Sequence, residues 1–301
     1  MSYAAVYLVW GSTYLFIKIA VETIPPLALV CCRWSIGGII FLFYYYARHG
    51  FTAPSRRELV SAFFMGMLLI FVPNSIVSAA ERNIDSYLTA LILAAAPIIV
   101  AFFDRFLMGK RVSLSVFAGM VTGLAGIAVL VYNGNSIQTS LSNEVFMLFG
   151  AVLAFGLGTS IGHRVNSGTS TVVNTGYQMA LSGAVAFVWI AVNEPGQLSA
   201  MGGFSARSLL ALAYLATAGS LAYGAYNYLI KHEPATRITS YALVNPVIAV
   251  ILGIVIGKES LARYVAIGVP VVIFGLAMMM YGEQFIKYAA EKISSARIAE
   301  E

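Results

Sequence analysis

Residues 87–132 read YLTALILAAAPIIVAFFDRFLMGKRVSLSVFAGMVTGLAGIAVLVY, two apolar runs separated by the polar turn GKRVS. A helix of about 20 apolar residues is long enough to cross the ~30 Å hydrocarbon core of a bilayer. The segment 239–281, TSYALVNPVIAVILGIVIGKESLARYVAIGVPVVIFGLAMMMY, has the same layout. Four pairs match at a constant offset of 149 positions: Pro97 and Pro246, Gly119 and Gly268, Gly126 and Gly275, and Tyr132 and Tyr281. The constant offset indicates an internal duplication.

Apolar runs of similar length fill the rest of the chain. Hydrophobic residues make up 59% of the sequence and charged residues only 10%, whereas soluble domains carry about 25% charged residues. Helices satisfy their own backbone groups in lipid, and the sequence lacks the alternating segments of about 10 residues that are typical of a membrane β-barrel. We therefore predict an all-α integral membrane protein with ten transmembrane helices, at 4–21, 27–47, 59–80, 86–106, 113–132, 144–163, 171–192, 207–230, 237–257 and 263–282.

The duplicated unit holds five of the predicted helices. Because five is an odd number, the second copy enters the membrane in the opposite orientation. We expect two inverted five-helix repeats, residues 1–133 and 134–284, followed by a charged tail at 285–301. Inverted repeats are typical of secondary transporters, in which the substrate binds near the bilayer midplane between the halves.

Lysine and arginine are distributed unevenly over the predicted loops. Of the 18 residues, twelve fall on the side of the N-terminus, four fall on the opposite side, and Lys18 and Arg33 lie inside spans near the outer face. Cytoplasmic loops carry the excess of positive charge. We therefore predict a multi-pass protein of the plasma (inner) membrane with both termini in the cytoplasm. The first apolar run lacks the features of a cleaved signal peptide and is expected to be a retained helix.

Several classes of function are disfavoured. No basic stripe with interleaved aromatic residues indicates nucleic-acid binding. Cys31 and Cys32 are adjacent within one predicted span, which suits neither a disulfide framework nor a zinc site, so we expect no metal and no other cofactor. The H-E-x-x-H and Walker-type motifs of common enzymes are missing from the sequence, and we predict that the protein is not an enzyme. The expected partners are a small-molecule substrate and the lipid bilayer, with the protein a monomer or a homodimer.

Short motifs in a fixed order carry a family resemblance. They are WGSTY at 10–14, PP at 25–26 followed by Arg33, Asn74 with AE at 80–81, AAAP at 94–97, and TSYALVNPVIAVILG at 239–253. Together, across residues 9–281, they resemble the EamA family of the drug/metabolite transporter superfamily. The resemblance implies a ten-helix inverted-repeat fold that moves small metabolites across a membrane, often outward, and it implies no single substrate.

Polar and aromatic residues inside the first predicted repeat are candidates for a substrate cavity, because a polar group in lipid is costly unless it faces a cavity or a partner. Trp10, Thr13 and Tyr14 share one face of the first helix. Trp10 would be a stacking surface, or alternatively an aromatic anchor at the membrane interface. Asn74 and Ser78 are four residues apart in the third helix, after a proline that can kink it. Asn74 would line the cavity, or would only satisfy backbone carbonyls freed by that proline.

The second predicted repeat supplies further candidates for the same substrate-binding cavity. They are Tyr177 and Gln178 in the seventh helix, Tyr223, Tyr226 and Asn227 in the eighth, and Tyr241 and Asn245 in the ninth. Asn245 precedes a proline in the middle of its span, where the first repeat has alanine before the corresponding proline. This asymmetry favours a functional role for Asn245 over a generic helix bend.

Four charged residues lie near the predicted outer ends of the first three helices: Lys18, Glu22, Arg33 and Glu81. Lys18 and Glu22 are four residues apart and can pair on one helix, and Arg33 and Glu81 can pair between helices. This charge cluster would form an outer gate, or would leave Arg33 or Lys18 to contact a carboxylate of the substrate. Glu81 is the carboxylate closest to the membrane interior, so flux would be facilitated or coupled to protons through Glu81.

The predicted function is secondary transport. The protein would export small metabolites such as amino acids, including aromatic ones, by alternating access between its inverted repeats. The aromatic candidates also suit cationic or aromatic drug-like compounds, through cation–π contacts. A membrane receptor or scaffold without transport activity is a further alternative, and it predicts that the polar faces inside the membrane pair off without leaving a cavity.

Overall fold

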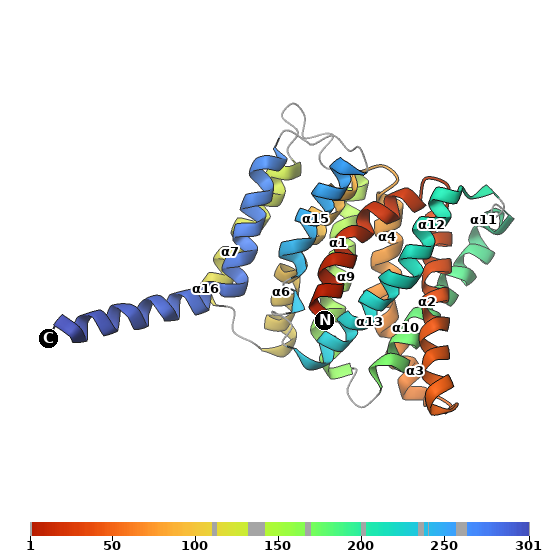
Figure 1. Ribbon diagram of the computed structural model, residues 1–301, viewed down its shortest axis with the longest axis horizontal. Coiled ribbons are helices and arrows are strands. Elements are labelled where there is room, and N and C mark those ends of the chain that lie inside the picture. Colours follow the sequence, from red (N-terminus) through yellow and green to blue (C-terminus); the bar gives the residue numbers. More distant parts are fainter. Residues whose placement is uncertain are drawn as a thin grey trace.

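Helices form all the regular structure that is described, which comprises residues 2–109, 113–131, 142–165, 170–199, 203–233, 238–239, 241–256 and 264–300 of the computed structural model (Figure 1). The α-helices are α1 (Ser2–Ala20), α2 (Pro26–His49), α3 (Arg56–Gly66), α4 (Val72–Ala80), α5 (Ser86–Leu93), α6 (Ala96–Met108), α7 (Leu114–Val131), α9 (Asn143–Val165), α10 (Thr171–Asn193), α11 (Gly196–Ser199), α12 (Ala206–Tyr214), α13 (Ser220–His232), α15 (Tyr241–Val255) and α16 (Val265–Glu300). Two π-helical segments, η1 (Met67–Phe71) and η3 (Leu215–Gly219), join α3 to α4 and α12 to α13.

The bundle has the dimensions and surface of a membrane protein. Seven stretches in the described residues are long and apolar enough to cross a membrane: Ser2–Ala20, Pro26–His49, Arg56–Ala80, Ser86–Leu107, Asn143–Gly162, Thr171–Asn193 and Ala206–His232. Three shorter apolar stretches, Leu114–Gly126, Val244–Gly253 and Ala266–Met279, fall inside the remaining predicted spans. Large apolar side chains such as Phe43, Leu210 and Phe274 are exposed, as a surface in contact with lipid requires. The protein is therefore all-helical and multi-pass, and the count of ten spans remains a prediction.

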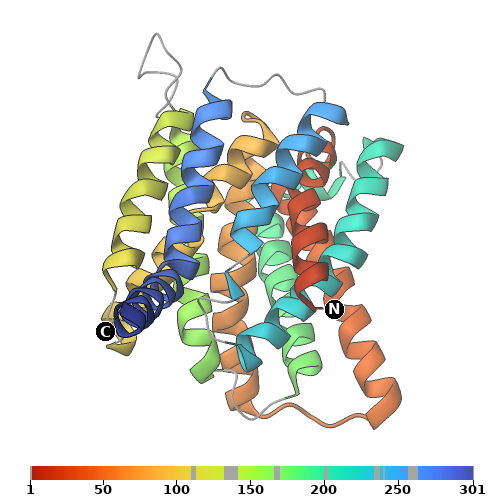
Figure 2. The same ribbon diagram turned by 60° about the vertical axis from the view of Figure 1, so that its left-hand side comes forward.

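Helices at corresponding places in the two predicted repeats run in opposite directions. In Figures 1 and 2, α1 rises from the N-terminus toward the edge of the bundle at which α9 begins, and α9 descends from it. The third span of each half carries the same irregularity, because η1 and η3 both lie in its middle. In η1 the N–H of Val72 donates to the carbonyl of Met67, five residues back. Such π-bulges are rare and frequent at functional sites, and no sequence pattern predicted them here.

Corresponding helices of the two halves pack against each other on opposite sides of the bundle (Figure 1). α2 packs against α10 on one side, and α7 packs against α16 on the other. Glycines permit both contacts. A Cβ added at Gly38 would lie 2.6 Å from the backbone nitrogen of Ala180, and one at Gly119 would lie 2.5 Å from the carbonyl oxygen of Gly275. Small residues allow helix backbones to approach closely in membranes. We call these contacts the α2–α10 seam and the α7–α16 seam.

The fourth predicted span, 86–106, is broken in its middle. α5 ends at Leu93 and α6 begins at Ala96, immediately before Pro97. Proline has no N–H to donate and disfavours helical geometry in the preceding residue. The corresponding helix α15 contains Pro246 and continues without a break. The first half therefore places a helix N-terminus, that of α6, in the interior of the bundle.

The predicted charged tail at 285–301 continues the last helix. α16 extends from Val265 to Glu300 as one element. Its final part projects from the bundle in Figure 1, next to α7 at its point of departure. The tail is thus helical through Glu300 and is separate from the helices that surround the cavity.

Candidate functional site

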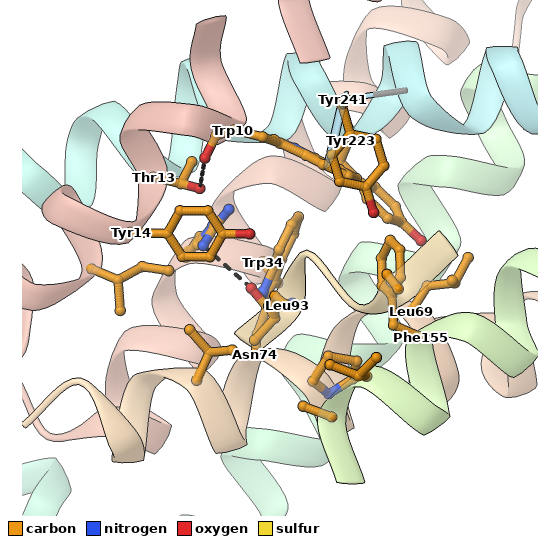
Figure 3. A pocket seen from close by; sticks show the side chains of 17 residues that line it. Trp10, Thr13, Tyr14, Trp34, Leu69, Asn74, Leu93, Phe155, Tyr223 and Tyr241 are labelled. Atoms are coloured by element: carbon orange, nitrogen blue, oxygen red, sulfur yellow. Dashed lines mark hydrogen bonds between the residues drawn. The ribbon is translucent and has the colours of Figure 1, made fainter. Parts of the chain in front are cut away.

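A cavity of about 90 Å³ lies inside the bundle (Figure 3). We call it the central cavity. Its walls come from α1, α2, η1, α4, α5 and α6 of the first half and from α9, α13 and α15 of the second half. Among the predicted substrate-binding residues, those that line it are Trp10, Thr13, Tyr14, Asn74, Tyr223 and Tyr241. The two halves therefore contribute side chains to one site.

Trp10 is the centre of an aromatic wall of this cavity. Its ring centroid lies 4.7 Å from that of Tyr226, 5.2 Å from that of Tyr241 and 6.0 Å from that of Phe155. These spacings are typical of favourable aromatic pairs. The contacts join α1 to α9, α13 and α15, so Trp10 lies at a junction of four helices. Tyr226 supports the wall from behind and is fully buried.

Thr13 and Tyr14 continue the α1 wall. The Thr13 hydroxyl donates to the carbonyl of Trp10 at 2.8 Å, so its hydrogen is used within the helix and its oxygen remains available as an acceptor. The Tyr14 ring lies between Thr13 and Asn74, and its hydroxyl points toward the interior of the cavity (Figure 3). α1 thus presents two hydroxyl oxygens to a bound molecule.

Arg33 and Asn74 form the polar side of the cavity. Arg33 is 4% exposed, and its Nη1 donates to Asn74 Oδ1 at 3.3 Å (Figure 3). The amide nitrogen of Asn74 donates to the carbonyl of Ile70 at 2.9 Å, which fixes the orientation of the amide. Ile70 belongs to η1, so the carbonyl that orients Asn74 comes from the π-helical segment. Asn74 therefore lines the cavity and also bonds a backbone carbonyl of its own span.

Two neighbours set the electrostatic surroundings of Arg33. Its guanidinium carbon lies 4.3 Å from the ring centroid of Trp34, a cation–π contact. Glu81, which is 1% exposed at the end of α4, interacts electrostatically with Arg33 and with the Tyr14 hydroxyl. A buried charge in a membrane protein is costly unless it has such partners. Arg33 also lies on the cavity wall, whereas the sequence had left open both an outer gate and contact with a carboxylate of the substrate.

Gln178 and Asn227 lie behind the cavity and hold Tyr223. The Tyr223 hydroxyl donates to Gln178 Oε1 at 2.6 Å, and Asn227 Nδ2 donates to the same oxygen at 3.2 Å. All three side chains are buried. Only Tyr223 lines the central cavity. The two amides therefore orient a cavity residue, whereas the sequence pattern had predicted direct contact with substrate.

Tyr177 lies in a second cavity, of about 120 Å³, between the end of α2, the start of α3 and the start of α10. Its hydroxyl is 2.7 Å from that of Tyr46. Asn174 and Glu58 also line this second cavity. Tyr177 was predicted to share a site with Trp10, and the structure separates them because the start of α10 lies at one end of the bundle (Figure 1).

Two further predicted residues serve the helix packing. Asn245 is buried, and with its amide nitrogen assigned to face two carbonyls it donates to Tyr7 at 3.1 Å and to Tyr241 at 3.3 Å. It therefore links α15 to α1 and does not line the central cavity. Ser78 is buried in α4 and likewise lies outside the cavity lining.

The charged residues near the end of α1 pair differently from the sequence prediction. Lys18 Nζ lies 3.2 Å from Asp85 Oδ1 and donates to the carbonyl of Ile84 at 2.7 Å. Glu22 pairs with Arg207 at 3.4 Å. The expected Lys18–Glu22 pair on one helix is thus replaced by two pairs that join α1 to the α4–α5 turn and to α12. Of the two, the Glu22–Arg207 pair joins the first half to the second, whereas the Lys18–Asp85 pair lies within the first half.

Sequence reasoning missed several residues of the cavity. Trp34 and Phe155 line it together with Leu69, Leu93 and Val152. Apolar residues in an apolar span carry no signal that separates a cavity wall from a lipid-facing surface. Trp34 was missed although its position carries a signal, because it directly follows a charged residue inside a span.

Comparisons with known proteins give one consistent result. The EamA-like transporter family matches this chain over residues 2–132 and again over 142–281. The chain is 32% identical over 283 residues to YedA of Escherichia coli (strain K12), described as an uncharacterized inner membrane transporter, and the match covers 93% of this chain and 89% of YedA. It is 26% identical over 251 residues to protein PagO of Salmonella typhimurium (strain LT2), covering 82% and 81% of the two chains.

More distant similarities support the same fold. A WAT1-related chloroplastic protein of Arabidopsis thaliana is 22% identical over 288 residues, which covers 91% of this chain and 67% of that protein. A protein of known crystal structure superposes with a TM-score of 0.69 at 19% identity, covering 92% of this chain and 96% of the other. At that identity the likeness shows the fold alone.

Proposed function

The chain belongs to the EamA-like transporter family, and we propose that it exports small metabolites such as amino acids, including aromatic ones, through the central cavity. Membership makes the protein a multi-pass membrane transporter and confirms the resemblance carried by its motifs. The proposal adds the substrate class, the site and the direction. It also includes the ten-helix arrangement of two inverted repeats, residues 1–133 and 134–284, with both termini in the cytoplasm.

One observation carries the proposal: side chains from both halves line a single cavity inside the bundle. In transporters built from inverted repeats, the substrate binds between the repeats near the midplane. The lining combines an aromatic wall around Trp10 with a polar side at Arg33 and Asn74. A cavity that is mostly apolar and has a few convergent polar groups is typical of small-molecule sites.

The chemistry of the lining favours an amino acid with an apolar or aromatic side chain. The aromatic wall offers ring faces and edges at stacking distance. Arg33 can donate to a carboxylate, and the hydroxyl oxygens of Thr13 and Tyr14 can accept hydrogen bonds from an ammonium group. An amino acid of this kind combines an apolar or aromatic side chain, a carboxylate and an ammonium group in one small molecule.

Alternating access would use the irregular helices that surround the cavity. η1 and η3 interrupt the regular hydrogen bonding of the third span in each half, and such interruptions are sites at which helices bend. The α2–α10 and α7–α16 seams are held by backbone contacts at glycines. We expect the seams to persist while the helices between them change their tilt.

The alternative substrates fit less well. A cationic drug-like compound would meet the aromatic wall favourably, but it would also meet the buried guanidinium of Arg33, which repels it. A receptor or scaffold without transport activity predicts that the polar faces close on one another. The central cavity is the observation that favours a transporter over that alternative.

The test is flux of radiolabelled amino acids into or out of proteoliposomes. Trp10→Ala removes the centre of the aromatic wall and should reduce flux at least tenfold while the protein is still inserted. Trp189→Ala is the matched control, because Trp189 is 51% exposed on α10 and lies outside the cavity lining. Equal flux for wild type and Trp10→Ala would exclude the central cavity as the transport site.

Asn245→Ala is a second test, in which we expect flux to fall for a different reason. Asn245 links α15 to α1 through the carbonyl of Tyr7, so its loss should reduce flux by loosening the wall that carries Tyr241. Thermal stability in detergent should fall together with flux. A loss of flux without any loss of stability would instead indicate that Asn245 contacts the substrate directly.

A further inference from the structure

We propose that Arg33 is the anchor for a carboxylate of the substrate, so that transport requires a small monocarboxylate with an apolar or aromatic body. The inference rests on the proposed function, since it assigns chemistry to the same cavity. Of the two roles that the sequence left open for Arg33, an outer gate or contact with a carboxylate of the substrate, it selects the second. It also divides the lining into a carboxylate end and an apolar end.

The first argument is the unused hydrogen-bonding capacity of Arg33. A guanidinium has five N–H donors. Nη1 donates to Asn74, whereas the buried Nε has no acceptor among the described residues. A buried donor without an acceptor costs stability and calls for an explanation such as a bound ligand. Arg33 lines the cavity, so a substrate oxygen can supply the missing acceptor.

The second argument is the geometry of the contact with Trp34. The guanidinium stacks over the indole ring, with its carbon 4.3 Å from the ring centroid. Stacking occupies the flat face of the guanidinium, whereas carboxylates bind to its edge in the same plane. The cation–π contact and a carboxylate can therefore be held at the same time.

A second donor without an acceptor lies beside the first. Trp34 is 2% exposed, lines the same cavity, and its Nε1 has no acceptor among the described residues. Consecutive residues of α2 thus bring two unsatisfied N–H groups to one wall. Both groups are donors, and a carboxylate offers two oxygens that only accept. An ammonium group or another donor could satisfy neither.

Glu81 balances the charge of Arg33 within the protein. It is buried at the end of α4 and interacts electrostatically with Arg33, and it does not line the cavity. The carboxylate of a substrate reaches Arg33 from the cavity side, beside Trp34. The aromatic wall around Trp10 then accommodates the apolar part of the molecule.

The test uses three probes that share a phenylethyl body, on the full chain in detergent and in proteoliposomes. L-phenylalanine carries a carboxylate and an ammonium group, 3-phenylpropanoate carries only the carboxylate, and phenethylamine carries only the ammonium group. Binding is measured by thermal shift and flux by counterflow. We expect both carboxylates to bind on the order of 10–100-fold more tightly than phenethylamine, the range for hydrogen bonds to a charged group.

Variants assign the preference to Arg33. Arg33→Gln should reduce the ratio of carboxylate to amine affinity to about one. Arg48→Gln is the matched control, because Arg48 also stacks on an aromatic residue of α2, at 4.8 Å from the Tyr44 ring, but is exposed. If Arg33→Gln does not insert, Arg33→Lys keeps the charge without the planar fork. It should then weaken carboxylate binding and leave phenethylamine unchanged.

Each outcome decides between the two proposals. Equal wild-type affinity for phenethylamine and L-phenylalanine overturns the anchor and leaves an amino-acid transporter possible. Binding of 3-phenylpropanoate without L-phenylalanine supports the anchor and overturns the amino-acid substrate. Failure of both carboxylates to bind overturns the anchor, as does an Arg33 variant with an undiminished preference for carboxylates.

Discussion

Gly219 lies against the guanidinium of Arg33, so that a Cβ added at position 219 would be 3.1 Å from Nη2. Gly219 is the last residue of η3 in the second half, whereas Arg33 belongs to α2 in the first. Asn74, whose Oδ1 accepts from the other terminal nitrogen of the guanidinium, lies in α4, three residues after the end of η1. One buried arginine therefore contacts the helix next to each π-bulge, and both bulges shape the polar side of the cavity.

Gly219→Ala should shift the guanidinium by a few tenths of an ångström, because a Cβ at 3.1 Å is closer than ordinary van der Waals contact. We expect flux of the transported solute to fall several-fold in proteoliposomes with little loss of thermal stability. Gly150→Ala is the matched control, since the closest atom to its added Cβ is 4.0 Å away. Equal effects of the two substitutions would contradict a specific role for Gly219.

Gly38→Ala should destabilise the α2–α10 seam. The added Cβ would lie 2.6 Å from the backbone nitrogen of Ala180, and the helices must separate to accommodate it. Overpacking of this kind costs about 1–3 kcal/mol, which should appear as a lower melting temperature in detergent. Gly196→Ala, with nothing within 4 Å of the new Cβ, should leave the melting temperature unchanged. A seam that tolerates Gly38→Ala would argue that α2 and α10 are free to separate.

Asp85→Asn should change gating more than stability. Lys18 and Asp85 are partly exposed and 3.2 Å apart, and ion pairs of this kind contribute only about 0.2–1 kcal/mol. If their contact helps to close the outer end of the bundle, its loss should alter the flux rate while the melting temperature moves little. Lys18→Met should have the same effect, and the double variant should add nothing further. Additive effects of the two substitutions would show that the residues act independently.

Gln178→Leu should leave two buried groups without their acceptor. The Tyr223 hydroxyl and the Asn227 amide both donate to Gln178 Oε1, and each unsatisfied group costs about 1–3 kcal/mol. We expect a lower melting temperature together with reduced flux, since Tyr223 loses its fixed position in the cavity wall. Adding Tyr223→Phe to Gln178→Leu should recover part of the stability, because one stranded donor is removed. If the melting temperature does not recover, the stranded Tyr223 hydroxyl is not the source of the lost stability.

The sequence by itself determined the membrane character, the family and the broad function. Long apolar runs and their polar separators are local properties, because a helix in lipid must satisfy its backbone within its own length. The glycines matched at an offset of 149 predicted the duplication, and several of them lie in the α7–α16 seam. Trp10, Thr13, Tyr14, Asn74, Tyr223 and Tyr241 line the cavity as expected from their polarity or aromaticity within apolar spans.

Only the tertiary structure decided which partner each polar residue has. Lys18 pairs with Asp85 rather than Glu22, Arg33 turns into the cavity, and Tyr177 lies in a separate cavity. Partner choice depends on how far each helix is rotated and shifted against its neighbours, and several such arrangements satisfy the same apolar pattern. The π-bulges rotate the residues that follow them by a fraction of a turn, so the face that Asn74 presents follows from packing that no local pattern in the sequence encodes.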